Sequence, residues 1–126
     1  PPGLLFEAIR AVEGDDGSIG PAGERGAYRI TRAYWTDALK QWVKLVNDPK
    51  ITLQRAEELF DYNTWVSSQQ MCEAMMELYW DRYHADTDEK KLAVHVAGPT
   101  GIAKMKNSKE IQKYIQDVKE YMAWHQ

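Results

Sequence analysis

The chain has 126 residues, of which 44% are hydrophobic and 28% are charged, and its formal net charge is -3. This length and composition indicate one globular domain over residues 1–126, large enough to bury a core. The acidic balance argues against non-specific binding to nucleic acid or to an acidic membrane surface, and no apolar run approaches the ~20 residues of a membrane span. Cys72 is the one cysteine, so an intrachain disulfide is excluded.

Apolar residues recur at helical spacing at the start of the chain. They predict an amphipathic helix over about residues 3–13, with its apolar face formed by Leu4, Leu5, Ala8, Ile9 and Val12. Glu13 ends this helix at the edge of the apolar face. The negative end of the helix dipole and partial burial both disfavour a carboxylate there, so we expect a raised pKa for Glu13, as a general acid requires. The alternative is a solvated glutamate at a helix end.

A glycine-rich segment follows the first helix. Residues 14–26 hold five glycines, a proline and two aspartates, which is too irregular a composition for a helix. The segment is either a surface turn region or a loop with a binding role. A phosphate-cradling loop is disfavoured, because no Gly-Lys-Ser/Thr follows and the preceding element is a helix rather than a strand.

Two further helices are predicted after this segment. Thr31 is the expected N-cap of the first, which carries a stripe of apolar and aromatic side chains. We expect Trp35 and Trp42 to lie in the core and leave Tyr34 open between the core and a ligand contact. A second, short helix follows an Asn-Asp-Pro break, with Thr52 as its cap. Its expected inner face comprises Arg55, Ala56, Leu59 and Phe60.

A long helix is predicted over residues 63–84. Its apolar residues are Trp65, Val66, Met71, Cys72, Met75, Met76, Tyr79 and Tyr83. Because this face is too broad for a helix lying on the surface, we expect the central buried helix here. The methionines are interpreted as core packing rather than metal ligands, and Cys72 as a small buried hydrophobe.

Two helices are predicted in the last part of the chain, so the expected fold class is mainly α. The first spans residues 89–96 and ends at Gly98. Its expected inward residues are Leu92, Ala93 and Val96. The second begins with a capping box of Asn107 and Glu110. Its apolar stripe comprises Ile111, Tyr114, Ile115, Val118, Tyr121 and Met122.

The sequence predicts neither a metal site nor a cofactor. His84, His95 and His125 share no ligand spacing, and no His-Glu-x-x-His or Cys-x-x-Cys motif occurs. No signal peptide is visible at the start of the chain.

The run from Val12 to Asp37 resembles the invertebrate-type lysozymes and their bacterial relatives in the lysozyme and lytic transglycosylase superfamily. Those proteins place a catalytic Glu at a helix end, followed by a loop, a Gly-aromatic-Gln-Ile strand and an Ala-Tyr-Trp helix start. The equivalent segments here are Glu13, the loop of residues 14–25, GAYRI at 26–30 and AYWTD at 33–37. In addition, HVAGPTG at 95–101 is similar to the family's His-Asn-Gly-Gly-Pro segment, and Tyr114 falls where the family carries a cleft-facing Tyr.

This resemblance implies a lysozyme-like α+β fold, with a central buried helix and a small hairpin or ordered loop near residues 17–30 as one cleft wall. It implies a peptidoglycan-cleaving glycosidase or lytic transglycosylase, with Glu13 as general acid and base. The implied partner is peptidoglycan or a related glycan, bound by a monomer in an extracytoplasmic location, either periplasmic or secreted. The implied substrate-binding residues are Tyr28, Arg29, His95, Gly98, Pro99 and Tyr114.

Several positions depart from the family pattern. Arg29 replaces a Gln, Val96-Ala97 replaces Asn-Gly, and the disulfides of the invertebrate enzymes are absent. The second carboxylate has no clean match either. Its candidates are Asp15, Asp16 and Glu24, and Pro21 is the residue that could occupy the equivalent place. A lytic transglycosylase works with one carboxyl, because its intramolecular attack needs no enzymic nucleophile, so this departure favours that variant or a weak hydrolase.

Arg29 decides between cleavage and an alternative function. If its guanidinium paired with Glu13, the carboxyl would stay ionised, and the domain would bind glycan or a protein partner without cleaving it. Because strand residues alternate in direction, we expect Arg29 to point outward or toward bound sugar instead. A third hypothesis is a helical interaction module whose resemblance to the family is accidental. We also expect the first helix to pack on the methionine-rich helix around residues 71–79. Residues 14–27 are then expected to form the opposite wall of the cleft.

Overall fold

The computed structural model describes residues 3–14 and 17–126, and it is mainly helical, as the sequence predicts. The helices are α1 (Leu4–Glu13), α2 (Arg32–Val46), α3 (Leu53–Leu59), α4 (Tyr62–Trp65), α5 (Gln69–Arg82), α6 (Asp88–Ala97), α7 (Gly101–Lys104) and α8 (Lys109–Trp124), with a short 3-10 turn, η1 (Gly98–Thr100). The described residues contain no strand. The sequence resemblance implies a small hairpin or an ordered loop near residues 17–30. The structure has a loop there, closed by an isolated antiparallel bridge between Arg25 and Ile30.

Side-chain caps explain where most of these helices begin. An oxygen of each cap accepts a hydrogen bond from the backbone N–H three residues later. The caps are Thr31, Thr52, Asp61, Ser68, Thr87 and Ser108. The predictions for Thr31 and Thr52 are confirmed. The predicted helix over 63–84 is wrong at its start, because Ser68 caps a new helix there, and Ser108 rather than Asn107 caps α8.

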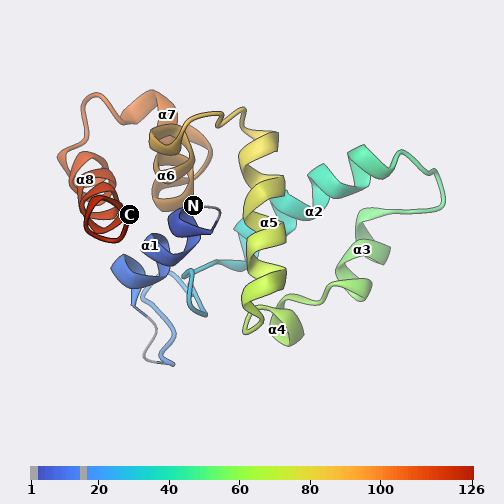
Figure 1. Ribbon diagram of the computed structural model, residues 1–126. Coiled ribbons are helices and arrows are strands. Elements are labelled where there is room, and N and C mark those ends of the chain that lie inside the picture. Colours follow the sequence, from blue (N-terminus) through green and yellow to red (C-terminus); the bar gives the residue numbers. More distant parts are fainter. Residues whose placement is uncertain (1–2, 15–16) are drawn as a thin grey trace.

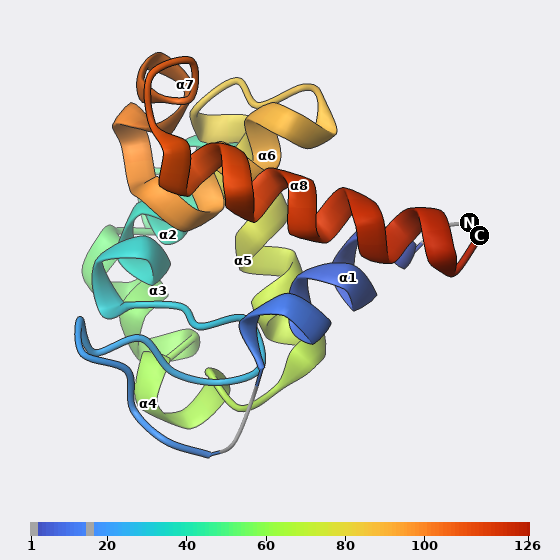
Figure 2. The same ribbon diagram turned by 90° about the vertical axis from the view of Figure 1, so that its left-hand side faces the viewer.

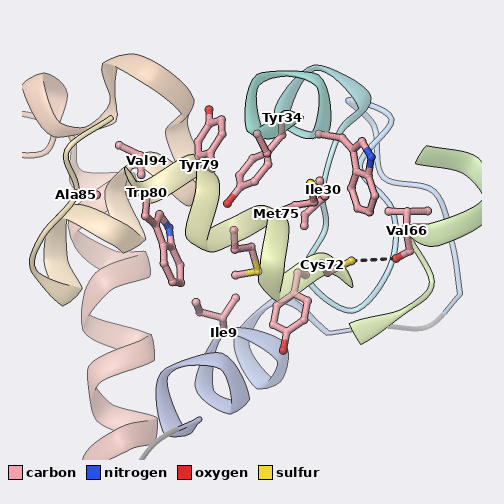
Figure 3. Close-up of a cluster of buried hydrophobic side chains, with 14 of the residues drawn as sticks. Ile9, Ile30, Tyr34, Val66, Cys72, Met75, Tyr79, Trp80, Ala85 and Val94 are labelled. Carbon is pink, nitrogen blue, oxygen red and sulfur yellow. Dashed lines mark hydrogen bonds between the residues drawn. The ribbon is translucent and has the colours of Figure 1, made fainter. Parts of the chain in front are cut away.

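Helix α5 passes through the middle of the molecule (Figure 1). Its buried residues include Cys72, Met75, Met76 and Tyr79, so the prediction that the methionines and the cysteine belong to the core is confirmed. The Cys72 thiol donates a hydrogen bond to the Val66 carbonyl oxygen at 3.1 Å (Figure 3). Burial raises the pKa of this thiol to about 12, so it is un-ionised at neutral pH.

Four residues expected on inner faces are exposed instead: Arg55, Leu59, Trp65 and Val96. Ala56 is the one buried residue of α3, which leaves Leu59 at its solvent side. Trp65 belongs to α4 rather than to the central helix. In α6 the inward face comprises Leu92, Ala93, Val94 and His95, so Val96 turns outward.

Helix α1 packs on α5 as expected. The rings of Phe6 and Trp80 stack with centroids 5.5 Å apart, and Arg10 forms a 3.4 Å ion pair with Glu73. The sequence did not predict the second neighbour of α1, which is α8. The two helices run side by side in Figure 2 and contact each other along their lengths. None of the described helices is long and apolar enough to cross a membrane.

The loop that precedes α2 is held against the α4–α5 connection at Gly26. This glycine has a φ of 77°, and a Cβ there would lie 2.5 Å from the backbone oxygen of Val66. We therefore expect Gly26→Ala to lower the free energy of unfolding by at least about 2 kcal/mol, because backbone strain and a clash with fixed backbone add together. Urea denaturation measures this loss.

Gly23→Ala is the matched control. Gly23 has a φ of 81°, but beyond its chain neighbours none of the described residues has an atom within 4 Å of the position that a Cβ would take, so strain acts there alone. Its expected cost is about 1 kcal/mol. Equal losses in the two variants would contradict the close packing of Gly26 on Val66.

Candidate active site

A cleft of about 470 Å³ opens where the end of α1, the loop of residues 17–30, α2, α5 and α6 meet. Its lining residues are Glu13, Ala22, Glu24, Arg29, Thr31, Ala33, Tyr34, Asp37, Tyr79, His95, Val96, Gly98 and Pro99. The structure therefore brings together five of the seven residues selected from the sequence as catalytic or substrate-binding: Glu13, Arg29, His95, Gly98 and Pro99. Tyr28 and Tyr114 are not among the lining residues.

Glu13 is the half-buried last residue of α1. Loss of solvent on burial raises the pKa of its carboxyl above the usual range. The hydroxyl of Tyr114 and the positive charge of Arg29 act in the opposite direction and are smaller, whereas the nearby charge of Glu24 raises the pKa further. A carboxyl that keeps its proton to higher pH and borders a cleft has the properties of a general acid.

Tyr114 of α8 lies behind Glu13 and is 8% exposed. Burial, above all, and the neighbouring Glu13 carboxyl raise the pKa of its hydroxyl. The hydroxyl oxygen has no hydrogen-bond partner among the described residues, so it approaches Glu13 without the geometry of a full hydrogen bond. Tyr114, which was expected to face the cleft, is thus a buried residue that lies behind the Glu13 carboxyl.

His95 is a buried residue of α6 that joins the loop to α2. Its Nε2 lies 2.9 Å from the Tyr28 carbonyl oxygen, and its Nδ1 lies 3.0 Å from the Tyr34 hydroxyl. Because a carbonyl oxygen can only accept, Nε2 carries the hydrogen, and Nδ1 accepts the hydrogen of Tyr34. Burial lowers the pKa of His95 to about 4. The imidazole is therefore neutral at neutral pH, and its two hydrogen bonds fix the cleft wall.

Tyr28 does not reach the cleft with its hydroxyl, contrary to the expectation from the sequence. The side chain is fully buried, and its hydroxyl donates a 2.5 Å hydrogen bond to Glu73 and accepts one from Arg10. Residues 26–29 form a turn rather than a strand, so the ring is directed to the side away from the cleft. The Tyr28 carbonyl, through its bond to His95, is the part that supports the site.

Arg29 lines the cleft, but the argument from strand alternation is wrong for it. Its φ of 53° is left-handed, which places the residue in a turn. The guanidinium donates hydrogen bonds to the carbonyl oxygens of Gly14 at 3.1 Å and Ser18 at 2.9 Å. Arg29 thus ties the first part of the glycine-rich segment to the turn that follows it, and its charge acts on Glu13.

Two further carboxylates border the cleft. Glu24 was one of the sequence candidates, and its Oε2 accepts a 2.9 Å hydrogen bond from the Ala22 backbone N–H. Asp37 was missed, although it lies three residues after Tyr34 and therefore on the same face of α2. The other two candidates, Asp15 and Asp16, lie outside the described residues. Within the described part of the chain, no group of three or more His, Cys, Asp or Glu side chains could hold a metal ion.

Comparison of the chain with protein-family models, with curated proteins and with solved structures finds no match. The likeness in motif order to the lysozyme superfamily is therefore a sequence resemblance alone.

Proposed function

We propose that this protein cleaves the glycan strands of peptidoglycan, or of a related glycan, as a lysozyme-like glycosidase or lytic transglycosylase in an extracytoplasmic location. The observation that carries the proposal is Glu13: a half-buried carboxyl of raised pKa on the wall of a cleft built from five segments of the chain. The motif order around Glu13 supports the same function.

In the proposed reaction, protonated Glu13 gives its proton to the glycosidic oxygen while the bond from this oxygen to the sugar C1 breaks. Positive charge develops on the sugar ring. The carboxylate of Glu24, whose charge also acts on Glu13, contributes to the electrostatic stabilisation of that charge. In the transglycosylase variant, the sugar's own 6-hydroxyl then attacks C1 and gives its proton to Glu13. In the hydrolase variant, water takes the place of the 6-hydroxyl.

The remaining lining residues shape the path of the glycan. Gly98 adopts a φ of 80° at the end of α6, and the nearest atom to a Cβ there would be the Tyr79 hydroxyl at 3.8 Å. With no side chain at Gly98 and a compact ring at Pro99, a sugar can approach the backbone of this turn. His95 is hydrogen-bonded to the Tyr34 hydroxyl and to the Tyr28 carbonyl oxygen. These two bonds fix the wall of the cleft formed by α2 and the loop.

A second candidate function is binding of a glycan without cleavage. The observation that favours it is the positive charge of Arg29, which lowers the pKa of Glu13 against the effect of burial. The two functions make opposite predictions for Arg29→Gln. Under the binding function, the variant gains cleavage because the charge is removed. Under the cleavage function, it loses activity because the bonds to Gly14 and Ser18 are lost.

Purified peptidoglycan provides the test. We expect wild-type protein to release soluble fragments, with anhydro-sugar ends from a transglycosylase and reducing ends from a hydrolase, and we expect Arg29→Gln to release them more slowly. Retention on the insoluble wall without release, together with a gain of release in Arg29→Gln, would support the binding function. Neither retention nor release would overturn both.

A further inference from the structure

Asp37 lies at one end of the cleft. Its side chain contacts Tyr83 and Lys40 rather than Glu13 or Arg29. Its Oδ2 accepts a 2.5 Å hydrogen bond from the Tyr83 hydroxyl, a neutral donor. Its Oδ1 lies 3.8 Å from the Lys40 ammonium, a loose pair within one turn of α2. The Asp37 side chain is 23% exposed, whereas that of Lys40 is 47% exposed. The carboxylate is therefore held in place by Tyr83, and its one cationic partner among the described residues is the loosely paired, exposed Lys40.

Tyrosine side chains lie near this carboxylate. Tyr34 and Tyr79 stack with centroids 3.7 Å apart and an interplanar angle of 10°, and they lie side by side in Figure 3. Tyr83 meets Tyr79 edge to face at 4.9 Å. Tyr34, Asp37 and Tyr79 all line the cleft. A carboxylate beside tyrosine rings in a concave site is the combination that binds an ammonium group, because the carboxylate accepts its hydrogen bonds and the rings attract its charge.

The charge of the whole cleft favours the same kind of ligand. Its described lining residues include three carboxyls, on Glu13, Glu24 and Asp37, and one guanidinium, on Arg29. His95 is neutral because burial lowers its pKa to about 4. Arg29 bonds to loop carbonyls at the Glu13 end. The cleft is thus formally negative, and its Asp37 end lacks a basic lining residue among those described.

We propose that the Asp37 end of the cleft binds a primary ammonium group carried by the substrate, so that a glycan with free amino sugars binds more tightly than its N-acetylated counterpart. The ammonium donates its N–H hydrogens to the Asp37 carboxylate, against the Tyr34 and Tyr79 rings. The inference names the substrate class of the cleft and rests on the proposed function for the glycan itself.

Calorimetric titration tests this proposal without requiring cleavage. The probes are a glucosamine pentamer and an N-acetylglucosamine pentamer, compared at a pH low enough to protonate the free amines. We expect wild type to bind the glucosamine pentamer about tenfold more tightly. Asp37→Asn keeps the acceptor for Tyr83 and should bind the two pentamers equally. The matched control is Asp117→Asn, which removes one exposed negative charge on α8 and should retain the preference.

A second pair of probes locates the ammonium group. A short lysine-containing stem peptide is compared with the same peptide acetylated on its side chain. Preference for the free peptide amine, abolished by Asp37→Asn, would support the ammonium site and assign its ligand to the peptide rather than the sugar. Equal wild-type affinity for the free and acetylated forms of both probes would overturn the proposal.

Salt dependence covers the case in which Asp37→Asn fails to fold. A carboxylate–ammonium contact weakens as salt rises, so the wild-type preference should shrink. A preference that is independent of salt would overturn the proposal. The two proposals also fail separately. Release of N-acetylated peptidoglycan fragments without any amine preference would overturn the ammonium site alone, and amine preference without cleavage of either glycan would support the site and overturn the proposed function.

Discussion

Glu13→Gln is expected to lower the rate of glycan cleavage about a thousandfold, while the protein keeps its fold. The amide has the shape of the carboxyl but no proton to give to the leaving oxygen, and general acid catalysis contributes roughly 10²- to 10⁴-fold. The measurement is release of soluble fragments from purified peptidoglycan. Glu7→Gln is a matched control on the same helix: Glu7 accepts a hydrogen bond from Tyr121, outside the cleft, and its variant should cleave at the wild-type rate.

The same substitution has a predicted effect on stability, whose sign follows from the raised pKa. Folding favours the protonated form of Glu13, so ionisation destabilises the folded state. The stabilising contribution is fully present below the unfolded pKa of about 4.3 and is lost as the pH rises through the higher folded value. Glu13→Gln lacks this loss. We therefore expect the variant to be at least as stable as wild type at neutral pH, as urea denaturation at several pH values can measure.

Glu24 separates the two chemical variants of the proposed reaction. Its carboxylate accepts a hydrogen bond from the Ala22 backbone N–H, which holds it in place on the loop. A transglycosylase needs no second carboxyl, and under that route Glu24→Gln should keep most of the activity. A loss equal to that of Glu13→Gln would favour a hydrolase with two carboxylates. Unchanged cleavage in Glu13→Gln itself would overturn the assignment of the acid.

The helices were predictable because their signals are local. Thr31 and Thr52 are followed by helical periodicity, and the caps bind backbone groups only three residues away. The same local rule explains the error over residues 63–84. The apolar pattern continues through Ser68, but the serine side chain accepts the Met71 N–H and begins a second helix there. Periodicity reports which faces are apolar, and caps decide where a helix starts.

The site residues that end helices were predictable, whereas the orientation of Tyr28 and the role of Asp37 were not. Glu13 and Gly98 end helices, and helix ends can be inferred from sequence. The direction of Tyr28 depends on Glu73, which is 45 residues away along the chain, and no local pattern contains that information. Asp37 looked like an ordinary polar residue of a helix, and its place in the site depends on the hydroxyl of Tyr83, which is 46 residues away along the chain.

His95 should control the acid stability of the protein. The folded pKa is about 4 because of burial, whereas that of an unfolded histidine is about 6.5. Below pH ~6.5 the unfolded chain binds a proton that the folded protein excludes, so the free energy of unfolding falls as the pH drops toward 4. The two pKa values correspond to a loss of order 3 kcal/mol.

His95→Gln is expected to remove most of this pH dependence and to lower stability at pH 7 by about 1–3 kcal/mol. The amide can still donate to the Tyr28 carbonyl, but the acceptor for the buried Tyr34 hydroxyl is lost. Urea denaturation between pH 7 and 4 measures both effects. His125→Gln is the control, because His125 is exposed at the end of α8 and its variant should keep the wild-type slope. Parallel pH profiles for wild type and His95→Gln would show that another group carries the acid sensitivity, and that His95 is not the neutral link between α6, the loop and α2.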